Sequence, residues 1–169
     1  MEEHKKQFEE TYEMYADAIY KFCVYKTSDP KQAEDLAAET FIRLWEYVAS
    51  GKDIENTKSF LYQIARNLII DFYRKKKSSS LEKMQDEGFE PSNDDYEKIQ
   101  NTSEIRMAID TINTLEEKYR DVVYMKLVEE MDLKGISESL NITINNATVR
   151  LHRGLKQLQK LIENQNNGN

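Results

Sequence analysis

Apolar residues recur every three or four positions along most of the chain, a spacing that places them on one face of a helix. The first such stripe consists of Phe8, Tyr12, Tyr15, Ile19 and Phe22. The expected helices span about residues 6–26, 31–48, 59–77, 105–115, 116–131, 132–140 and 144–162. With only 5 Gly and 2 Pro to interrupt it, this pattern predicts an all-α fold.

Local residues mark several helix boundaries. Asp29 directly precedes Pro30 at the start of the second helix, and a capping aspartate followed by a proline in the first turn is a common helix start. Ser59 is placed to cap the third helix. The last helix is expected to end near Ile162, and we predict that the polar tail over residues 164–169 is disordered.

A polar and acidic interval divides the helical pattern into two blocks. Residues 78–103 contain two lysines and seven carboxylates, together with Gly88 and Pro91, and such a composition is typical of a flexible linker. The sequence therefore predicts two small helical domains, residues 1–77 and 104–163, joined by a flexible acidic linker.

The composition narrows the class of protein. The 169 residues suffice for one ordinary domain or two small ones. No apolar run approaches the ~20 residues of a membrane-spanning helix, and the N-terminal MEEHKKQFEE lacks the apolar core of a signal peptide. The single cysteine, Cys23, lies between Phe22 and Val24 and is expected to be a small buried hydrophobe. We therefore expect a cytoplasmic protein that does not insert into membranes.

The third helix gathers aromatic, amide and cationic residues opposite its expected core, although the net charge of the chain is -7. The expected core face holds Phe60, Leu61, Ile64, Ala65, Leu68 and Phe72. The opposite face holds Tyr62, Gln63, Arg66, Asn67, Ile69, Ile70, Tyr73, Arg74 and Lys77. Aromatic rings stack on bases and cations contact phosphates. Packing on another helix, with cations that suit the end of a helix, explains this face equally well.

The last two expected helices, separated by Asn141, Ile142 and Thr143, form a helix-turn-helix pattern. The expected core face of the final helix holds Ala147, Leu151, Gly154, Leu155, Leu158 and Ile162. Its outward face holds Thr148, Val149, His152, Arg153, Lys156 and Lys160. No carboxylate occurs between Glu138 and Glu163. Cations for phosphates, polar groups for base edges and a valine for a thymine methyl group favour a DNA-reading helix over a plain helical hairpin.

The second helix has an outward face of another kind, formed by Asp35, Ala38, Glu39, Ile42 and Glu46. An exposed isoleucine within an acidic stripe suits docking on a basic protein surface. A solvated helix face is the commoner explanation of such a pattern, so the choice depends on the rest of the chain.

Three stretches, in this order, resemble bacterial RNA polymerase sigma factors of the extracytoplasmic-function type, within the sigma-70 superfamily. They are AEDLAAETFIRLW at 33–45, SFLYQIARNLIIDFYRKKK at 59–77 and the terminal helix-turn-helix. The resemblance covers both domains and leaves out only the linker. It implies a factor that binds core RNA polymerase, directs it to promoters and helps to open promoter DNA.

The resemblance assigns roles to three groups of residues. Docking on the polymerase clamp falls to Asp35, Glu39, Ile42, Trp45 and Glu46. Reading and opening of the minus-ten element fall to Tyr62, Arg66, Asn67, Tyr73, Arg74 and Lys77, with the loop from Gly51 to Thr57 holding a flipped-out base. Reading of the minus-thirty-five element falls to Asn145, Thr148, Val149, His152, Arg153 and Lys156.

The same resemblance implies the partners. They are the clamp and the flap of core RNA polymerase and promoter DNA, and the free protein is expected to be a monomer without cofactor or metal. Whether an anti-sigma factor holds the chain stays open. Gly154 replaces an alanine that is common in the family, at a cost of about 1 kcal/mol of helix propensity. Ala38 stands where the docking motif of the family commonly has Gln, which leaves the clamp contacts open. Thr143, Asn146 and Ala147 also depart from the usual pattern, which leaves the promoter sequence open.

Two other functions remain compatible with the residues. A stand-alone helix-turn-helix regulator would need only the C-terminal domain and would usually bind DNA as a dimer. A helical adaptor would use the exposed aromatic residues as protein contacts. An enzyme is not expected, because the two histidines, His4 and His152, lie far apart in the sequence and no metal-binding cluster or glycine-rich phosphate loop occurs.

Overall fold

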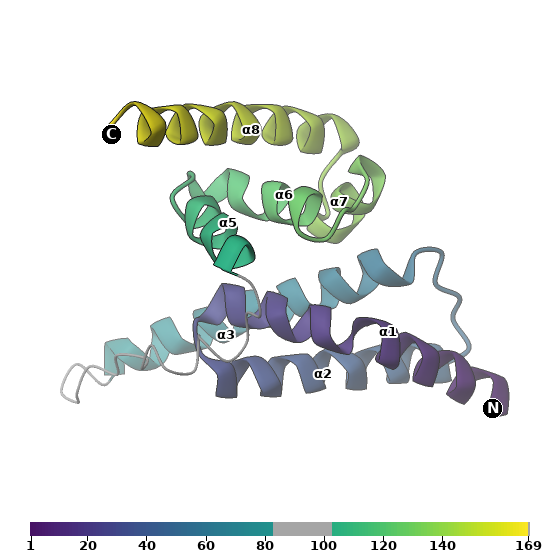
Figure 1. Ribbon diagram of the computed structural model, residues 1–169. Coiled ribbons are helices and arrows are strands. Elements are labelled where there is room, and N and C mark those ends of the chain that lie inside the picture. Colours follow the sequence, from purple (N-terminus) through teal and green to yellow (C-terminus); the bar gives the residue numbers. More distant parts are fainter. Residues whose placement is uncertain (83–102, 169) are drawn as a thin grey trace. The chain divides into compact units, whose positions relative to one another are not determined.

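The computed structural model describes residues 1–82 and 103–168, and within these residues it contains seven helices and no strand (Figure 1). The helices are α1 (Glu2–Thr27), α2 (Pro30–Ala49), α3 (Thr57–Glu82), α5 (Ser103–Asn113), α6 (Glu117–Leu127), α7 (Leu133–Leu140) and α8 (Ile144–Asn167). The all-α prediction is confirmed.

The chain divides into two units, residues 1–99 and 100–169. Most of the predicted linker, residues 83–102, lies outside the described residues. The first helical block extends beyond its predicted end at residue 77, because α3 continues to Glu82. Within this extension the Ser78 hydroxyl donates to the Lys75 carbonyl at 2.9 Å, a local bond that a helix accommodates.

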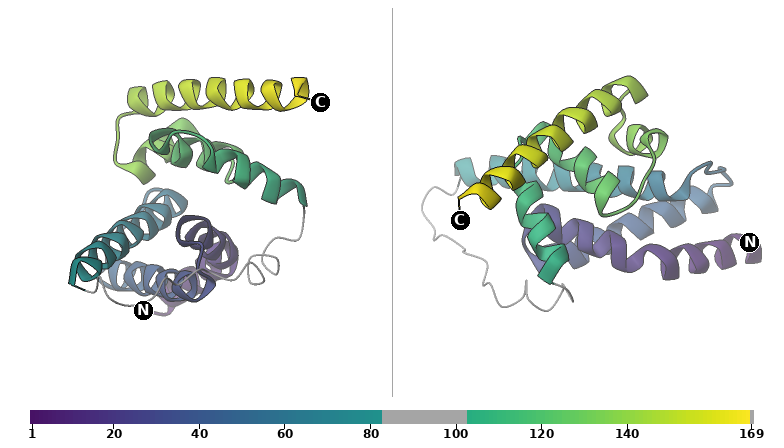
Figure 2. Two further views of the ribbon diagram at one scale, coloured as in Figure 1. Left: turned by 90° about the vertical axis from the view of Figure 1, so that its left-hand side faces the viewer. Right: turned by 45° about the horizontal axis from the view of Figure 1, so that its top comes forward.

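In the first unit, α1 packs along α2 and α3 packs against both, as the left view of Figure 2 shows. The fully buried side chains at the centre of this bundle are Ile19, Phe22, Cys23, Leu44, Leu61, Tyr62 and Ile69. Burial raises the pKa of the Cys23 thiol to about 12, because removal from water penalises the thiolate. The prediction of a buried cysteine is confirmed.

The helix starts of this unit follow from local side chains. The Asp29 carboxylate accepts the backbone N–H groups of Lys31 and Gln32 at 3.0 and 3.3 Å, as the aspartate–proline pair predicts. The prediction for the third helix is wrong: Asn56, not Ser59, caps α3, and its side-chain oxygen accepts the Ser59 N–H at 3.0 Å. Ser59 lies inside the first turn of α3 rather than before it, and its side chain is buried.

The second unit contains the predicted helix-turn-helix. Asp132 caps α7 by accepting the Gly135 N–H at 2.7 Å, and Thr143 caps α8 by accepting the Asn146 N–H at 3.1 Å. Between them Asn141 adopts a left-handed conformation with φ of 52°, which ends α7 and turns the chain toward α8. These three residues fix the two helices relative to each other.

The last helix is longer than the pattern predicts, because α8 continues through the expected tail to Asn167. Within this extension the Gln159 amide donates to the Glu163 carboxylate at 3.2 Å, one turn further on. Leu155 and Ile162, expected in the core, are exposed. For Ile162 the reason is that α8 meets the start of α6 at Gln157, and the following turns continue past that contact.

Gly154 lies where α8 packs tightly on α6. A Cβ atom at this position would lie 2.6 Å from Cγ2 of Val123 and 3.1 Å from Cβ of Tyr119. Distances below 3.0 Å are not tolerated without movement, and both neighbours are short, buried segments of side chain. Close packing of the two helices therefore accounts for the glycine, which helix propensity alone would disfavour.

We predict that Gly154→Ala destabilises the second unit. Alanine gains about 1 kcal/mol of helix propensity, but overpacking a filled core costs about 1–3 kcal/mol, which leaves a net loss of about 0–2 kcal/mol. The 2.6 Å approach to Val123 places the expected loss in the upper part of this range, and urea unfolding followed by circular dichroism measures it. Gly168→Ala is the matched control, because its Cβ would meet no atom closer than 3.4 Å. If the Gly154 variant is as stable as the wild type, the packing of α6 on α8 must be able to relax around a Cβ atom without loss of free energy of unfolding.

Candidate docking face and nucleic-acid interfaces

The predicted docking residues lie on one outward face of α2. Asp35 and Glu46 are exposed, and Ile42 keeps 52% of its surface accessible. The Glu39 carboxylate accepts from Nε of Arg43 at 3.0 Å, and Trp45 is half-buried. The structure therefore places this set on the surface, as an acidic stripe around an exposed isoleucine.

This face continues into an apolar groove between α1 and α2 with a volume of about 610 Å³. The groove is lined by Lys5, Phe8, Glu9 and Tyr12 of α1 and by Ala38, Phe41, Ile42 and Trp45 of α2. Its walls are aromatic: the Phe8 ring lies 5.3 Å from Trp45, and the Tyr12 ring lies 4.8 Å from Phe41. Phe8 and Tyr12 thus join the candidate docking surface, which the sequence pattern had assigned to α2 alone.

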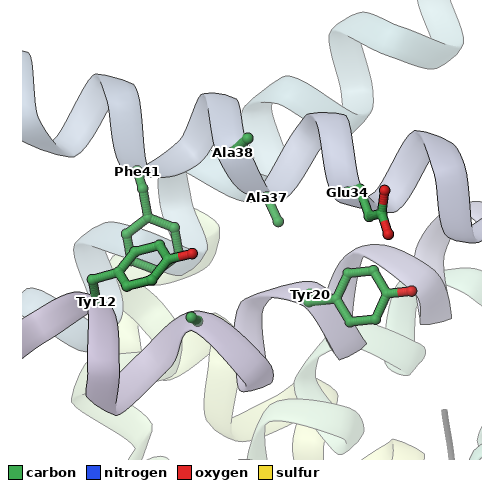
Figure 3. A pocket seen from close by; sticks show the side chains of 7 residues that line it. Tyr12, Tyr20, Glu34, Ala37, Ala38 and Phe41 are labelled. Carbon is green, nitrogen blue, oxygen red and sulfur yellow. The ribbon is translucent and has the colours of Figure 1, made fainter.

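A second hollow of about 280 Å³ follows along the same seam (Figure 3). It shares Tyr12, Ala38 and Phe41 with the groove, and Figure 3 shows it continuing past Ala37 toward Tyr20 and Glu34. The alanines leave space between the two helices because their side chains are short. The α1–α2 groove, as we call the two hollows together, is a continuous apolar channel with carboxylates at its edge.

The α3 face differs from the prediction at its first aromatic residue. Tyr62, predicted to point outward, is fully buried, and its ring packs edge-on against Phe22 of α1 at 5.1 Å. Ile69, also expected outside, is buried as well. The helical wheel assumed one buried stripe, whereas α3 packs against both α1 and α2 and buries a wider arc. The assignment of Tyr62 to base stacking is therefore wrong.

The rest of the predicted minus-ten set shares one side of α3. Asn67, Tyr73, Arg74 and Lys77 are exposed and Arg66 is half-buried, at spacings of three and four residues that place them on one face. Arg74 forms an ion pair with Asp71, one turn earlier. Ile70 joins the same face, and 44% of its surface is accessible.

Tyr73 is exposed but not free to rotate. Its hydroxyl donates to the carbonyl of Lys26, near the end of α1, at 2.6 Å, and 42% of the residue remains accessible. This hydrogen bond joins segments 47 residues apart in the sequence, and no local pattern could have indicated it. The ring is therefore held in place while part of its surface faces solvent.

The loop before α3 begins with a glycine in a left-handed conformation, Gly51, with φ of 76°. Next to it, the Lys52 ammonium lies 5.1 Å from the centre of the Tyr47 ring, and Tyr47 in turn packs on Phe60 at 4.6 Å. The loop therefore carries a cation on an aromatic pair. Its predicted role in holding a flipped base stays a prediction.

All six residues predicted to read the upstream element are exposed on α8, namely Asn145, Thr148, Val149, His152, Arg153 and Lys156. They follow a capped helix start, and the Thr148 hydroxyl donates to the Ile144 carbonyl at 2.8 Å. The opposite face packs on α6 and α7 through Ala147, Leu151 and Gly154. The structure thus presents amide, hydroxyl, apolar and cationic groups on one free side of the second helix of the helix-turn-helix.

Comparison with known families agrees with both units. Residues 11–79 match the family model of sigma-70 region 2, and residues 105–158 match that of sigma-70 region 4. The extracytoplasmic-function RNA polymerase sigma factor SigW of Bacillus subtilis is 31% identical over 163 residues, which cover 90% of this chain and 87% of SigW. The chain belongs to this sigma factor family. As a sigma factor, it directs RNA polymerase to promoters for transcription initiation.

Other relatives and solved structures agree with this assignment. RNA polymerase sigma factor SigZ of Bacillus subtilis is 30% identical over 156 residues, covering 92% of this chain and 86% of SigZ. The fold is similar to that of the sigma factor RpoE of Bartonella quintana in complex with the anti-sigma factor NepR, with a TM-score of 0.68, 19% identity and coverage of 94% and 98% of the two chains. CnrH in complex with the cytosolic domain of CnrY gives a TM-score of 0.67 at 15% identity, with coverage of 94% and 89%.

Among the residues that the structure describes, none of the helices combines the length and the apolar character needed to span a membrane.

We predict that the two tyrosines of α3 respond very differently to alanine. Tyr62→Ala removes a buried ring and should cost about 3–5 kcal/mol of stability. Tyr73→Ala removes a partly exposed ring and one hydrogen bond and should cost only about 0.5–1.5 kcal/mol. Thermal unfolding followed by circular dichroism compares the two directly. A Tyr62 variant as stable as the wild type would contradict the packing described for α3.

Proposed function

We propose that the tasks of this sigma factor are divided among three separate faces of the chain. The outward face of α2 with the α1–α2 groove docks on core RNA polymerase, α3 engages the opened minus-ten strand, and α8 reads the minus-thirty-five element. The observation that best supports this division is the distribution of charge on an acidic chain. The exposed side of α8 carries Arg153 and Lys156, in a stretch without any carboxylate from residue 139 to 162, while the α2 face is acidic.

Docking through α2 follows from the combination of charge and apolar surface. A continuous aromatic groove lined by Phe8, Tyr12 and Trp45 is large enough to accept the apolar side chains of a partner helix. The carboxylates of Asp35, Glu39 and Glu46 lie on the same face of α2 and favour a partner with cations beside its apolar ridge. A helix of the polymerase clamp is the partner that the resemblance assigns to this face.

Engagement of single-stranded DNA by α3 rests on its exposed side. Tyr73 offers a fixed ring on which a base can stack, and Arg74 and Lys77 lie where they can follow the phosphate backbone. Arg66 and Asn67 supply donors on the same face. Because Tyr62 is buried, Tyr73 is the aromatic residue of the predicted minus-ten set that can contact DNA.

Upstream reading by α8 follows the usual geometry of a helix-turn-helix, in which the second helix enters the major groove. Arg153 can donate to both acceptors of a guanine, and Val149 can contact a thymine methyl group. Both side chains are exposed on the same face of α8.

We further infer that the chain has no enzymatic activity and acts in the cytoplasm, where the polymerase and the chromosome are. Within the described residues, no group of three or more His, Cys, Asp or Glu side chains could hold a metal ion. RpoE and CnrH were solved in complex with NepR and with the cytosolic domain of CnrY, respectively. An anti-sigma factor is on these grounds a further proposed partner.

For the docking face, we predict that Glu39→Lys combined with Ile42→Glu weakens binding to core polymerase by about 2 kcal/mol or more, the scale of an interface hot spot. The measurement is a titration of labelled protein with the core polymerase of Bacillus subtilis. Glu13→Lys combined with Met14→Glu is the matched control, because both residues are exposed on α1 outside the groove. Equal affinity of the two double variants would argue against the α2 face.

For strand opening, we predict that Tyr73→Ala leaves binding of polymerase to duplex promoter intact but slows opening, because one stacking contact worth about 1–3 kcal/mol is lost. Tyr73→Phe retains the ring and should open DNA nearly as well as the wild type. Permanganate reactivity of thymines near the start site measures opening, and a premelted template should rescue the alanine variant. Normal opening of linear duplex by Tyr73→Ala would exclude the tyrosine as a stacking platform.

For upstream reading, we predict that Arg153→Ala relaxes preference at one base position by about 1–3 kcal/mol, whereas Lys156→Ala weakens all sequences about equally. The experiment is transcription by this chain with core polymerase on a linear template library randomised over both promoter windows, followed by sequencing of the transcribed templates. The wild type should enrich a defined upstream and a defined downstream element. A second selection recovers the templates of the same library that the chain binds without polymerase, and enrichment of an upstream element there would instead support a stand-alone regulator.

A further inference from the structure

Beside the buried residues Ala147 and Leu151, which pack on α6 and α7, two neighbouring contacts join the middle of α8 to α6. The first is the apolar contact at Gly154, which has no side chain to interlock with Tyr119 and Val123. The second lies one turn further along α8, where the side-chain amide of Gln157 meets Glu116. Its oxygen accepts the backbone N–H of Glu116 at 3.0 Å, and its nitrogen donates to Oε1 of the same residue at 3.3 Å.

The contact with Gln157 supplies a side-chain acceptor at the start of α6, where the helix has no capping hydrogen bond of its own. Glu116 is the N-cap residue of α6, and its side chain makes no capping hydrogen bond. The first N–H groups of a helix have no partner within the helix, and here the side chain of another helix accepts one of them. We call this pair of hydrogen bonds the 116–157 clasp.

The charge of Glu116 keeps the clasp in one orientation. Its other oxygen, Oε2, accepts from the Lys118 ammonium at 3.1 Å. The hydrogen bonds from Lys118 and Gln157 lower the pKa of Glu116, so the carboxylate is ionised at neutral pH and can only accept. The Gln157 nitrogen must therefore face the carboxylate and the Gln157 oxygen must face the backbone N–H.

Opposite an ionised Glu116, the carboxamide of Gln157 supplies both the donor and the acceptor that the two hydrogen bonds need. A lysine there would donate to the carboxylate but could not accept the N–H, and a glutamate would accept the N–H but repel the carboxylate. Polar contacts at exposed positions contribute little to stability, and Glu116 is exposed while Gln157 is half-buried. The effect of the clasp is therefore expected in the position of α8 rather than in the stability of the fold.

We propose that the 116–157 clasp is a positioning device that sets the rotation and axial position of α8 on α6, and so the register of its DNA-reading side chains. The inference rests on the proposed reading of the upstream element by α8. Gln157 directly follows Lys156 and lies one turn after Arg153, so any displacement at the clasp reaches these two side chains first. The contact at Gly154 resists separation of the helices but has no directional bond to resist sliding.

The test compares four full-length variants in transcription with Bacillus subtilis core polymerase on the template library randomised over both promoter windows. Gln157→Ala should reduce upstream base preference about threefold to tenfold, part of the roughly fivefold to 150-fold that one bidentate base contact carries. Gln157→Glu should reduce it further. The third variant combines Glu116→Gln with Gln157→Glu. It again places a carboxamide opposite a carboxylate, leaves the net charge unchanged, and should restore the upstream base preference.

The fourth variant, Gln159→Glu, is the matched charge control. It adds a carboxylate to α8 two residues further on, where the side chain contacts Glu163 rather than α6, and it should keep the wild-type preference. Downstream preference should be unchanged in all four variants. Urea unfolding should show equal stability for Gln157→Ala and the wild type, which separates a shift in register from a loss of folded protein.

Arg153→Ala, measured in parallel, distinguishes failure of this inference from failure of the proposed function. If Arg153→Ala has no effect on upstream preference, α8 is not the reader and the proposed function fails. If Arg153→Ala relaxes preference while Gln157→Ala does not, the clasp is not a positioning device. The inference is also overturned if the double variant Glu116→Gln, Gln157→Glu does not recover the upstream preference that Gln157→Glu loses.

Discussion

The burial of α3 between α1 and α2 is the constraint on which the first unit depends. Tyr62, Leu61 and Ile69 fill the space beside Phe22 and Leu44, and this two-sided packing determines which side of α3 remains in contact with solvent. Along the packed part of the helix the remaining side holds Asn67, Ile70 and Tyr73, and Arg74 and Lys77 follow where α3 becomes exposed all round. The packing of the core thus selects the residues of this helix that can meet a nucleic acid.

The sequence predicted the helices, the two units and the helix-turn-helix, because these follow from apolar spacing and from local capping residues such as Asp29 and Thr143. It also predicted the outward faces of α2 and α8, since each of these helices buries a single stripe. It failed for Tyr62, because an amphipathic wheel cannot show that a helix packs against two neighbours. It placed Gly154 on the core face, where the structure buries it, but it could not explain why a glycine stands there, because the reason lies in the side chains of Tyr119 and Val123 on another helix.

The distribution of charge leaves few sites on this acidic chain at which DNA can bind. The α2 face and the edge of the α1–α2 groove carry carboxylates, while exposed cations without a carboxylate between them lie at the end of α3 and along α8. Attraction to phosphates is a sum over contacts and weakens steeply with salt. A chain with a net charge of -7 therefore gains little from non-specific binding, and its two basic segments act best when the polymerase holds both of them near the promoter.

The buried thiol of Cys23 has a consequence for how this protein can receive a signal. Oxidants and electrophiles react with the thiolate, and a pKa of about 12 together with full burial leaves almost none of it to react. Since Cys23 is the single cysteine of the 169 residues, this sequence has no reactive sulfhydryl with which to sense redox stress directly. A redox signal would have to act on this chain through something other than its own thiol.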